Sequence, residues 1–145
     1  MLEFSKVMGL DIGDKRIGIA LSDPFKITAQ GTETYQRRDE ALDIAHIKEL
    51  CEKNKVYEIV CGFPKNMDGT TGPQAKKIAG FAKKLEKCIG IPVVLEDERL
   101  TTVFAERILL EADMSRQKRR KVIDKLAAVG ILQGYLDRTN PRKVF

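Results

Sequence analysis

The segment Lys6-Val-Met-Gly-Leu-Asp-Ile-Gly-Asp-Lys-Arg-Ile-Gly-Ile-Ala-Leu-Ser22 predicts a β-hairpin. Its two apolar runs, 6–12 and 16–22, are rich in residues that favour strands, and Gly13-Asp14 between them is typical of a tight turn. A single acidic residue, Asp11, interrupts the first run close to its end. A carboxylate at this place either forms part of the turn or faces a ligand.

The segments that follow alternate between strand and helix patterns. They predict a strand over 27–37, a helix over 39–54, a strand over 57–63, a loop over 64–72, a helix from Pro73 to about residue 88, a strand over 91–95, and helices over 101–112 and 115–137. In the first of these helices Asp39 is the expected N-cap, and Leu42, Ala45, Ile47 and Leu50 are the expected apolar face. The order predicts an α/β fold with a mixed five-stranded sheet flanked by α-helices.

Length and composition predict one globular domain. The chain has 145 residues, of which 43% are hydrophobic and 32% charged, as in ordinary globular proteins. We expect a single domain over 1–145 that ends in a short basic tail from about residue 138. No signal peptide or membrane span is evident, which predicts a cytoplasmic protein without a membrane partner. The cysteines, Cys51, Cys61 and Cys88, lack a C-x-x-C pair and are expected to be reduced core residues.

The net charge of +5 is concentrated near the C-terminal end of the sequence. Residues 115–145 contain nine basic and two acidic residues, a net charge of +7, so the rest of the chain carries −2. The block 116–121 is either the solvated start of a helix or a patch that neutralises the phosphates of a nucleic acid. Basic residues at a helix N-terminus oppose the helix dipole, a cost that an anionic partner would relieve.

Three acidic residues stand where a solvated carboxylate is not expected. Asp11 ends the first strand, Glu98 follows the fifth strand, and Asp124 shares a helix face with small and apolar residues. Convergence of the three would suit Mg2+ or Mn2+, which prefer carboxylate oxygens, and such ions activate water for attack on a phosphodiester. The alternatives are a turn at Asp11, an ion pair of Glu98 with Arg99, and neutralisation of Asp124 by neighbouring lysines.

The sequence offers few residues for other catalytic mechanisms. The one histidine, His46, falls on a predicted helix, where we expect a surface or partly packed imidazole. This argues against a Ser-His-Asp triad, a histidine-rich zinc centre and a ribonuclease that uses a pair of histidines.

Four segments resemble the signature blocks of the YqgF/RuvX family: GLDIGDKRIGIALSD at 9–23, GFPKNMDGTTGP at 62–73, DERLTT at 97–102 and DKLAA at 124–128. The resemblance implies a ribonuclease H-like fold and a nuclease. The family is described as acting at the 5′ end of pre-16S ribosomal RNA and as a Holliday junction resolvase. It also implies that Asp11, Glu98 and Asp124 form a catalytic triad that binds Mg2+ or Mn2+, and we favour Glu98 over its neighbour Asp97 as the ligand.

The expected partner is therefore a ribosomal RNA precursor or branched DNA, bound by a monomer or a homodimer. The residues expected to contact the nucleic acid are Lys15, Arg16, Asn66, Arg99, Arg116, Lys118, Arg119, Arg120, Lys121 and Lys125. Such contacts to phosphates give affinity without reading the sequence of bases.

Two hypotheses of other classes remain open. The pair Asp11 and Gly13 also resembles the phosphate loop of actin-like and sugar-kinase ATPases, which suggests a nucleotide-binding module. Those proteins close two such domains around ATP, and this sequence supplies one. A non-catalytic RNA-binding factor in ribosome assembly would use the basic helix and keep the acidic residues for structure.

Overall fold

The computed structural model describes residues 5–63, 72–97 and 116–139, and within 116–124 it describes the backbone alone. The elements are β1 (Lys6–Ile12), β2 (Arg16–Ser22), β3 (Ala29–Gln36), α1 (Glu40–Asn54), β4 (Val56–Phe63), α2 (Pro73–Ile89), β5 (Val93–Asp97) and α4 (Arg116–Thr139). The predicted helix over 101–112 and most of the predicted loop over 64–72 lie outside the described residues.

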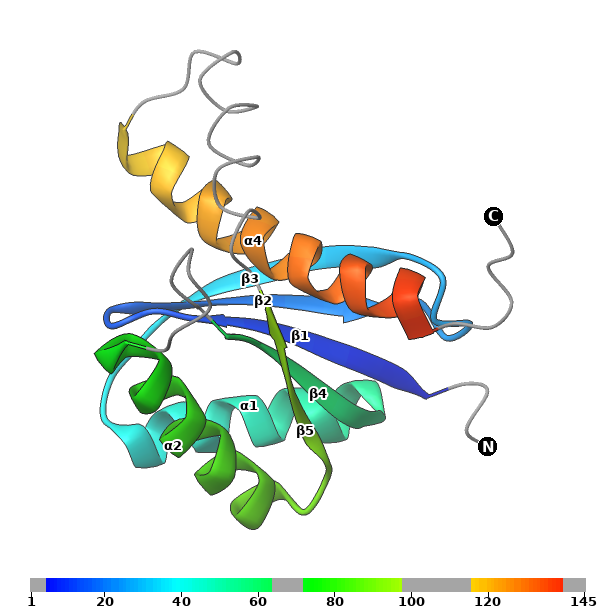
Figure 1. Ribbon diagram of the computed structural model, residues 1–145, viewed down its shortest axis with the longest axis horizontal. Helices are drawn as coiled ribbons and strands as arrows, with labels where there is room; N and C mark the ends of the chain where they lie inside the picture. Colours follow the sequence, from blue (N-terminus) through cyan, green and yellow to red (C-terminus); the bar gives the residue numbers. More distant parts are fainter. Residues whose placement is uncertain (1–4, 64–71, 98–115, 140–145) are drawn as a thin grey trace.

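The strands form one mixed five-stranded sheet in the order β3-β2-β1-β4-β5. β1, β2 and β3 are successive antiparallel neighbours, whereas β1, β4 and β5 run parallel to one another. Helices α1 and α2 cover one face of the sheet, and α4 lies across the other (Figure 1). The predicted α/β architecture, with a mixed five-stranded sheet and a hairpin over β1 and β2, is confirmed, and the structure adds that β1 lies at the centre of the sheet.

Alternation along β1 divides the core into two layers. Met8 and Leu10 are fully buried in the layer beneath α1 and α2. Val7 belongs to the layer beneath α4, together with Ala128 and Leu132. Because successive side chains of a strand point to opposite faces, the odd-numbered residues of β1 face α4.

A row of small residues lets α4 approach the sheet closely. Gly9, Ala20 and Gly31 are neighbours across β1, β2 and β3. A Cβ atom at Gly9 would lie 2.7 Å from Cβ of Leu132, and one at Gly31 would lie 2.9 Å from Cδ of Lys125. A larger residue at Gly9 would therefore push the helix away from the strands, and one at Gly31 would displace the Lys125 side chain. On the helix side of this contact, the small residues Ala127 and Ala128 are buried.

Gly9→Ala is expected to lower the free energy of unfolding by about 1–3 kcal/mol, because the added methyl group overpacks the contact with α4. Urea titration followed by circular dichroism measures this change. Gly134→Ala in α4 is the matched control, since a Cβ there meets no atom within 4 Å, and we expect it to stabilise the helix by about 0.5–1 kcal/mol. Equal stability of Gly9→Ala and the wild type would contradict the close approach.

The predicted fifth strand was misplaced by two residues. β5 begins at Val93 rather than at Ile91, and it continues to Asp97. Pro92 has no N–H to donate to the sheet, although its carbonyl accepts a hydrogen bond from Ile59 N at 3.0 Å. The ladder with β4 therefore starts one residue after the proline.

The predicted apolar face of α1 was partly wrong. Leu42 is 48% exposed and Ala45 is also exposed, while Asp43, Ile47 and Cys51 are buried. The helix is turned so that Asp43 points inward, toward Arg37. Asp39 is the N-cap, as predicted, and its side chain accepts a hydrogen bond from Leu42 N at 2.8 Å.

Two further expectations are corrected near the helix ends. Cys88 is exposed rather than buried, because the last core positions of α2 are Leu85 and Ile89. Arg138 belongs to α4, not to a basic tail, and forms an ion pair with Glu96 of β5 at 2.7 Å. In the described part of the chain, we find no helix with the length and apolar character needed to cross a membrane.

Candidate active site

Asp11 lies on the face of the sheet that α4 covers. Val7 packs beneath α4, and a Cβ at Gly9 would touch Leu132. Asp11 is two residues further along β1 and so points to the same side. It is half-buried, next to the end of the strand.

Glycines flank Asp11 on both neighbouring strands. Gly18 of β2 is its partner in the antiparallel register. On the other side Leu10 pairs with Cys61 of β4, so Gly62 continues the register beside Asp11. Neither neighbour has a side chain that would fill the space beside the carboxylate.

Helix α4 runs antiparallel to β1 and β3. Ala29, at the start of β3, donates a hydrogen bond from N to Oε1 of Gln133 at 2.8 Å. Gly31, two residues later, lies beside Lys125 and Val129. Rising residue numbers in β3 therefore correspond to falling numbers in α4. Because β1 and β3 are both antiparallel to β2, the same holds for β1.

This direction brings the helix turn that contains position 124 level with Asp11. Gly9 lies against Ala128 and Leu132. The step from Gly9 to Asp11 is about 6.6 Å along the strand, which equals four to five residues of helix toward the start of α4. Asp124 is one turn before Ala128, and the described backbone of α4 includes it.

The acidic residues of β5 point in different directions. Val93 packs against the layer beneath α1 and α2, so alternation places Asp97 on that side, away from Asp11. Glu96 faces α4 and accepts two hydrogen bonds from Arg138, at 2.7 and 2.9 Å. Glu98 lies outside the described residues. No trio of His, Cys, Asp and Glu close enough to hold a metal ion occurs among the residues that the structure describes.

Three of the predicted nucleic-acid contacts have described side chains. Lys15 is exposed in the turn of the hairpin, Arg16 is half-buried at the start of β2, and Lys125 lays its stem over Gly31. Arg116, Lys118, Arg119, Arg120 and Lys121 occupy the start of α4, where the backbone alone is described. Asn66 and Arg99 lie outside the described residues. Lys15 and Arg16 thus follow Asp11 in the hairpin, and Lys125 lies over β3 on the face of the sheet that Asp11 shares.

Arg37, which sequence reasoning missed, fixes the turn that follows Asp11. Its Nη1 donates to the carbonyl of Gly13 at 2.8 Å, and its backbone N donates to the carbonyl of Lys15 at 2.9 Å. Its Nε donates to Asp43 Oδ2 at 2.9 Å, and its guanidinium lies 4.9 Å from the centre of the Phe81 ring. These contacts tie the hairpin to both α1 and α2.

The carboxylate of Asp43 is almost fully buried, with 1% of its side chain exposed. Burial raises its pKa, but the hydrogen bonds from Arg38 N and from the Arg37 side chain outweigh this, so the pKa lies below the usual 3.8. No sequence signal identified this pair, because an acidic residue in the first turn of a helix is ordinarily solvated and favoured by the helix dipole.

His46 is partly packed, as predicted. Its ring stacks on Tyr35 with centroids 4.3 Å apart, and its Nε2 lies 3.2 Å from Oε1 of Glu33. It comes from α1, on the opposite face of the sheet from Asp11. The histidine therefore has structural contacts away from the candidate site.

Comparisons with known proteins agree with this fold. A family model described as "RuvX: Holliday junction resolvase" matches residues 5–138. A Clostridium kluyveri protein named "Putative pre-16S rRNA nuclease" is 56% identical over 133 residues, which cover 92% of this chain and 97% of that protein.

Two solved structures have the same fold. RuvC of T. thermophilus, in complex with a Holliday junction substrate, has a TM-score of 0.54 at 14% identity and covers 92% of this chain and 94% of its own. The Fowlpox virus resolvase, with Holliday junction DNA, has a TM-score of 0.59 at 11% identity, with coverages of 93% and 99%. At these identities the likeness shows the fold alone, which is ribonuclease H-like.

Proposed function

We propose, from the premise that this chain belongs to the RuvX family, that it is a metal-dependent nuclease that processes the 5′ end of pre-16S ribosomal RNA. The observation that carries the proposal is the placement of Asp11 at the end of β1, on the α4 face and between two glycine positions. Glycine on each side of a carboxylate at a strand end permits close approach by a ligand.

The residues that would hold the metal are Asp11, Glu98 and Asp124. Asp11 stands level with position 124 of α4, and Glu98 follows β5, which runs parallel to β1 and ends at the same edge of the sheet. An all-carboxylate donor set fits Mg2+ or Mn2+. When bound there, such an ion would activate a water and stabilise the leaving oxygen of the phosphodiester.

The side chains around Asp11 would orient the substrate. Lys15 and Arg16 follow it in the hairpin, and Lys125 approaches from α4. They would bind the phosphates that flank the scissile bond. Water attacks phosphorus and the bond to the 3′ oxygen breaks, so the products end in a 5′-phosphate and a 3′-hydroxyl.

The name of the Clostridium kluyveri relative favours a ribosomal RNA precursor as the substrate. The description of the family favours a Holliday junction as the second candidate. A resolvase cuts two strands and would favour a homodimer, whereas trimming of one RNA end requires one active site. Contacts to phosphates serve RNA and DNA alike, so the substrate must be tested directly.

Purified protein is expected to cleave a labelled precursor of 16S RNA near its 5′ end with Mg2+ or Mn2+ and to lose this activity in EDTA. Gel analysis of the products, with a four-way DNA junction in parallel, measures the preference. Cleavage of the junction alone would replace the preferred substrate with the second. If the protein cleaves neither the RNA nor the junction with any metal, and instead binds an ATP analogue or RNA tightly, the proposal that it is a nuclease is wrong.

A further inference from the structure

Helix α2 has a strongly positive outer surface that the proposed active site does not use. It contains five lysines and one glutamate, a net charge of +4, whereas α1 beside it contains two lysines and four acidic residues, a net charge of −2. The two helices cover the same face of the sheet (Figure 1). On this face of the sheet, the excess of positive charge therefore lies on α2.

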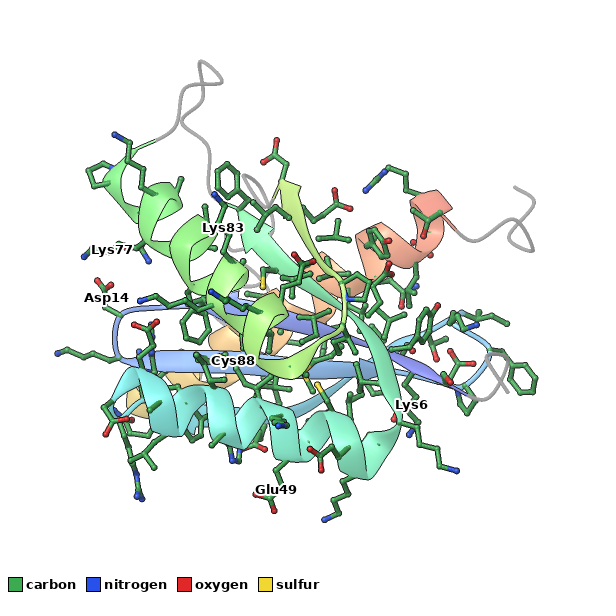
Figure 2. All side chains as sticks on the ribbon, turned by 90° about the horizontal axis from the view of Figure 1, so that it is seen from below. Lys6, Asp14, Glu49, Lys77, Lys83 and Cys88 are labelled. Carbon is green, nitrogen blue, oxygen red and sulfur yellow. The ribbon has the colours of Figure 1, made fainter. Side chains whose placement is uncertain are left out.

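Three of the lysines form a row on the side of α2 that points away from the core. Lys76, Lys83 and Lys87 are spaced by seven and four residues, which places them within about 40° of one another around the helix. All three are exposed, and Lys83 is seen on the outer surface of α2 in Figure 2. The row spans 11 residues, or about 16.5 Å. Among the described residues, no carboxylate forms an ion pair with any of the three.

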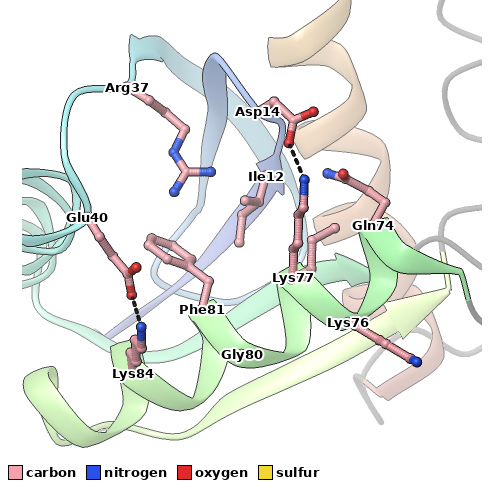
Figure 3. A pocket seen from close by; sticks show the side chains of 11 residues that line it. Ile12, Asp14, Arg37, Glu40, Gln74, Lys76, Lys77, Gly80, Phe81 and Lys84 are labelled. Atoms are coloured by element: carbon pink, nitrogen blue, oxygen red, sulfur yellow. Dashed lines mark ion pairs between the residues drawn. The ribbon is translucent and has the colours of Figure 1, made fainter.

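The other two lysines of α2 form ion pairs with the hairpin turn that follows Asp11 and with the start of α1. Lys77 Nζ is 3.9 Å from Oδ1 of Asp14, in the hairpin turn, and Lys84 Nζ is 2.9 Å from Oε1 of Glu40 (Figure 3). These pairs border a cavity of about 280 Å³, which Arg37 also lines. The row on α2 therefore begins beside the turn that follows Asp11 and leads away from it.

We propose that Lys76, Lys83 and Lys87 bind the phosphate backbone of the nucleic acid substrate where it extends beyond the active site. This inference rests on the proposed function and adds a second contact surface on the other face of the sheet from α4. Lysine is a flexible point charge that suits contacts independent of base sequence. Each phosphate contact releases counterions, so the surface has a measurable effect on the salt dependence of binding.

The test compares two double variants that remove equal charge. Lys83→Gln/Lys87→Gln changes the row, and Lys48→Gln/Lys53→Gln changes exposed lysines of α1. Binding is measured in EDTA, so that cleavage does not intervene, with an RNA hairpin that has a long 5′ extension and with a four-way DNA junction with long arms. Thermal melts check that both variants are folded.

We expect the slope of log association constant against log salt to fall in magnitude by about 1.4 for single-stranded RNA and about 1.8 for duplex DNA in the α2 variant. The α1 variant should keep the wild-type slope. If the α2 variant shows a smaller change in slope with a substrate trimmed close to the cleavage point, the proposal gains further support. Equal slopes for the two variants would overturn it, even if the protein is a nuclease. If the α2 variant has a reduced slope but the wild type cleaves neither substrate, the binding surface on α2 is supported and the proposed function is refuted.

Cys88 provides a second measurement on the same surface. It is the exposed one of the three cysteines, and burial raises the pKa of Cys51 to about 12, which keeps that thiol unreactive. A benzophenone maleimide attached to Cys88, next to Lys87, is expected to crosslink the RNA extension at low salt and not in the Lys83→Gln/Lys87→Gln variant. No adduct with the wild type would contradict the proposal.

Discussion

Asp11→Asn is expected to reduce the rate of metal-dependent cleavage by at least about 100-fold, since loss of groups that merely support a metal ligand already costs 10- to 100-fold. The substitution keeps the shape of the side chain and removes its charge, so the sheet should fold as before. Single-turnover cleavage of the labelled RNA precursor, at saturating protein, measures the rate. Binding in EDTA should be unchanged or slightly tighter, because a negative charge near the phosphates is removed.

Asp14→Asn is the matched control. Asp14 is three residues further along, and its side chain is 70% exposed and paired with Lys77 at 3.9 Å. The cleavage rate of Asp14→Asn should stay within about twofold of the wild-type rate, since exposed ion pairs contribute little. Equal activity of Asp11→Asn and Asp14→Asn would rule out Asp11 as a metal ligand and favour a role in the turn.

Arg37→Met is expected to lower the free energy of unfolding by about 3 kcal/mol, because it leaves the buried carboxylate of Asp43 without its charged partner. The loss lies at the lower end of the range for buried pairs because the Arg37 side chain is 20% exposed. It also removes the hydrogen bond to the Gly13 carbonyl. Urea denaturation at pH 7 measures the loss.

Arg38→Met serves as the control for this prediction. The Arg38 side chain is exposed, and its contact with Asp43 is through the backbone N–H, which the substitution keeps. Its stability should lie within about 0.5 kcal/mol of the wild type. A loss as large as that of Arg37→Met would mean that the guanidinium of Arg37 has no special role.

The same pair gives stability a dependence on pH. The pKa of Asp43 is lower in the folded state than its usual 3.8, so its carboxylate stabilises the fold above that value. This contribution is lost as the pH falls through the folded pKa. Acid titration of Arg37→Met should therefore show a smaller loss of stability below pH 4 than the wild type shows.

The hairpin was predictable because its signals are local. Residues 6–12 and 16–22 form strands with the predicted bounds, since strand propensity, the turn residues and the burial of both faces agree there. The orientation of α1 was not predictable. It depends on Asp43 and Arg37, and an ion pair of this kind overrides the apolar spacing of a helix.

The candidate site was predictable in part. Asp11 stood out as a charge within an apolar strand, and the structure adds its direction, toward α4, through the position of Gly9. That direction depends on the pairing of strands far apart in the sequence. The lysine row on α2 was passed over for another reason. Apolar residues such as Ile78, Phe81 and Leu85 indicate which side of that helix faces the core, but the sequence did not indicate that the helix lies beside the hairpin turn. The tie between Lys77 and the hairpin turn is likewise a tertiary contact.

The close approach of α4 to the row of Gly9, Ala20 and Gly31 has a consequence for the order of events during synthesis. The antiparallel strands emerge early from the ribosome, and the helix that covers them is the last described element of the chain. Until it docks, one apolar side of the sheet has no cover, which exposes the nascent chain to aggregation. The first strand and this helix are both needed to assemble the proposed metal ligands. If these ligands are the catalytic ones, a nascent chain that lacks the helix is expected to be inactive toward the nucleic acids around it.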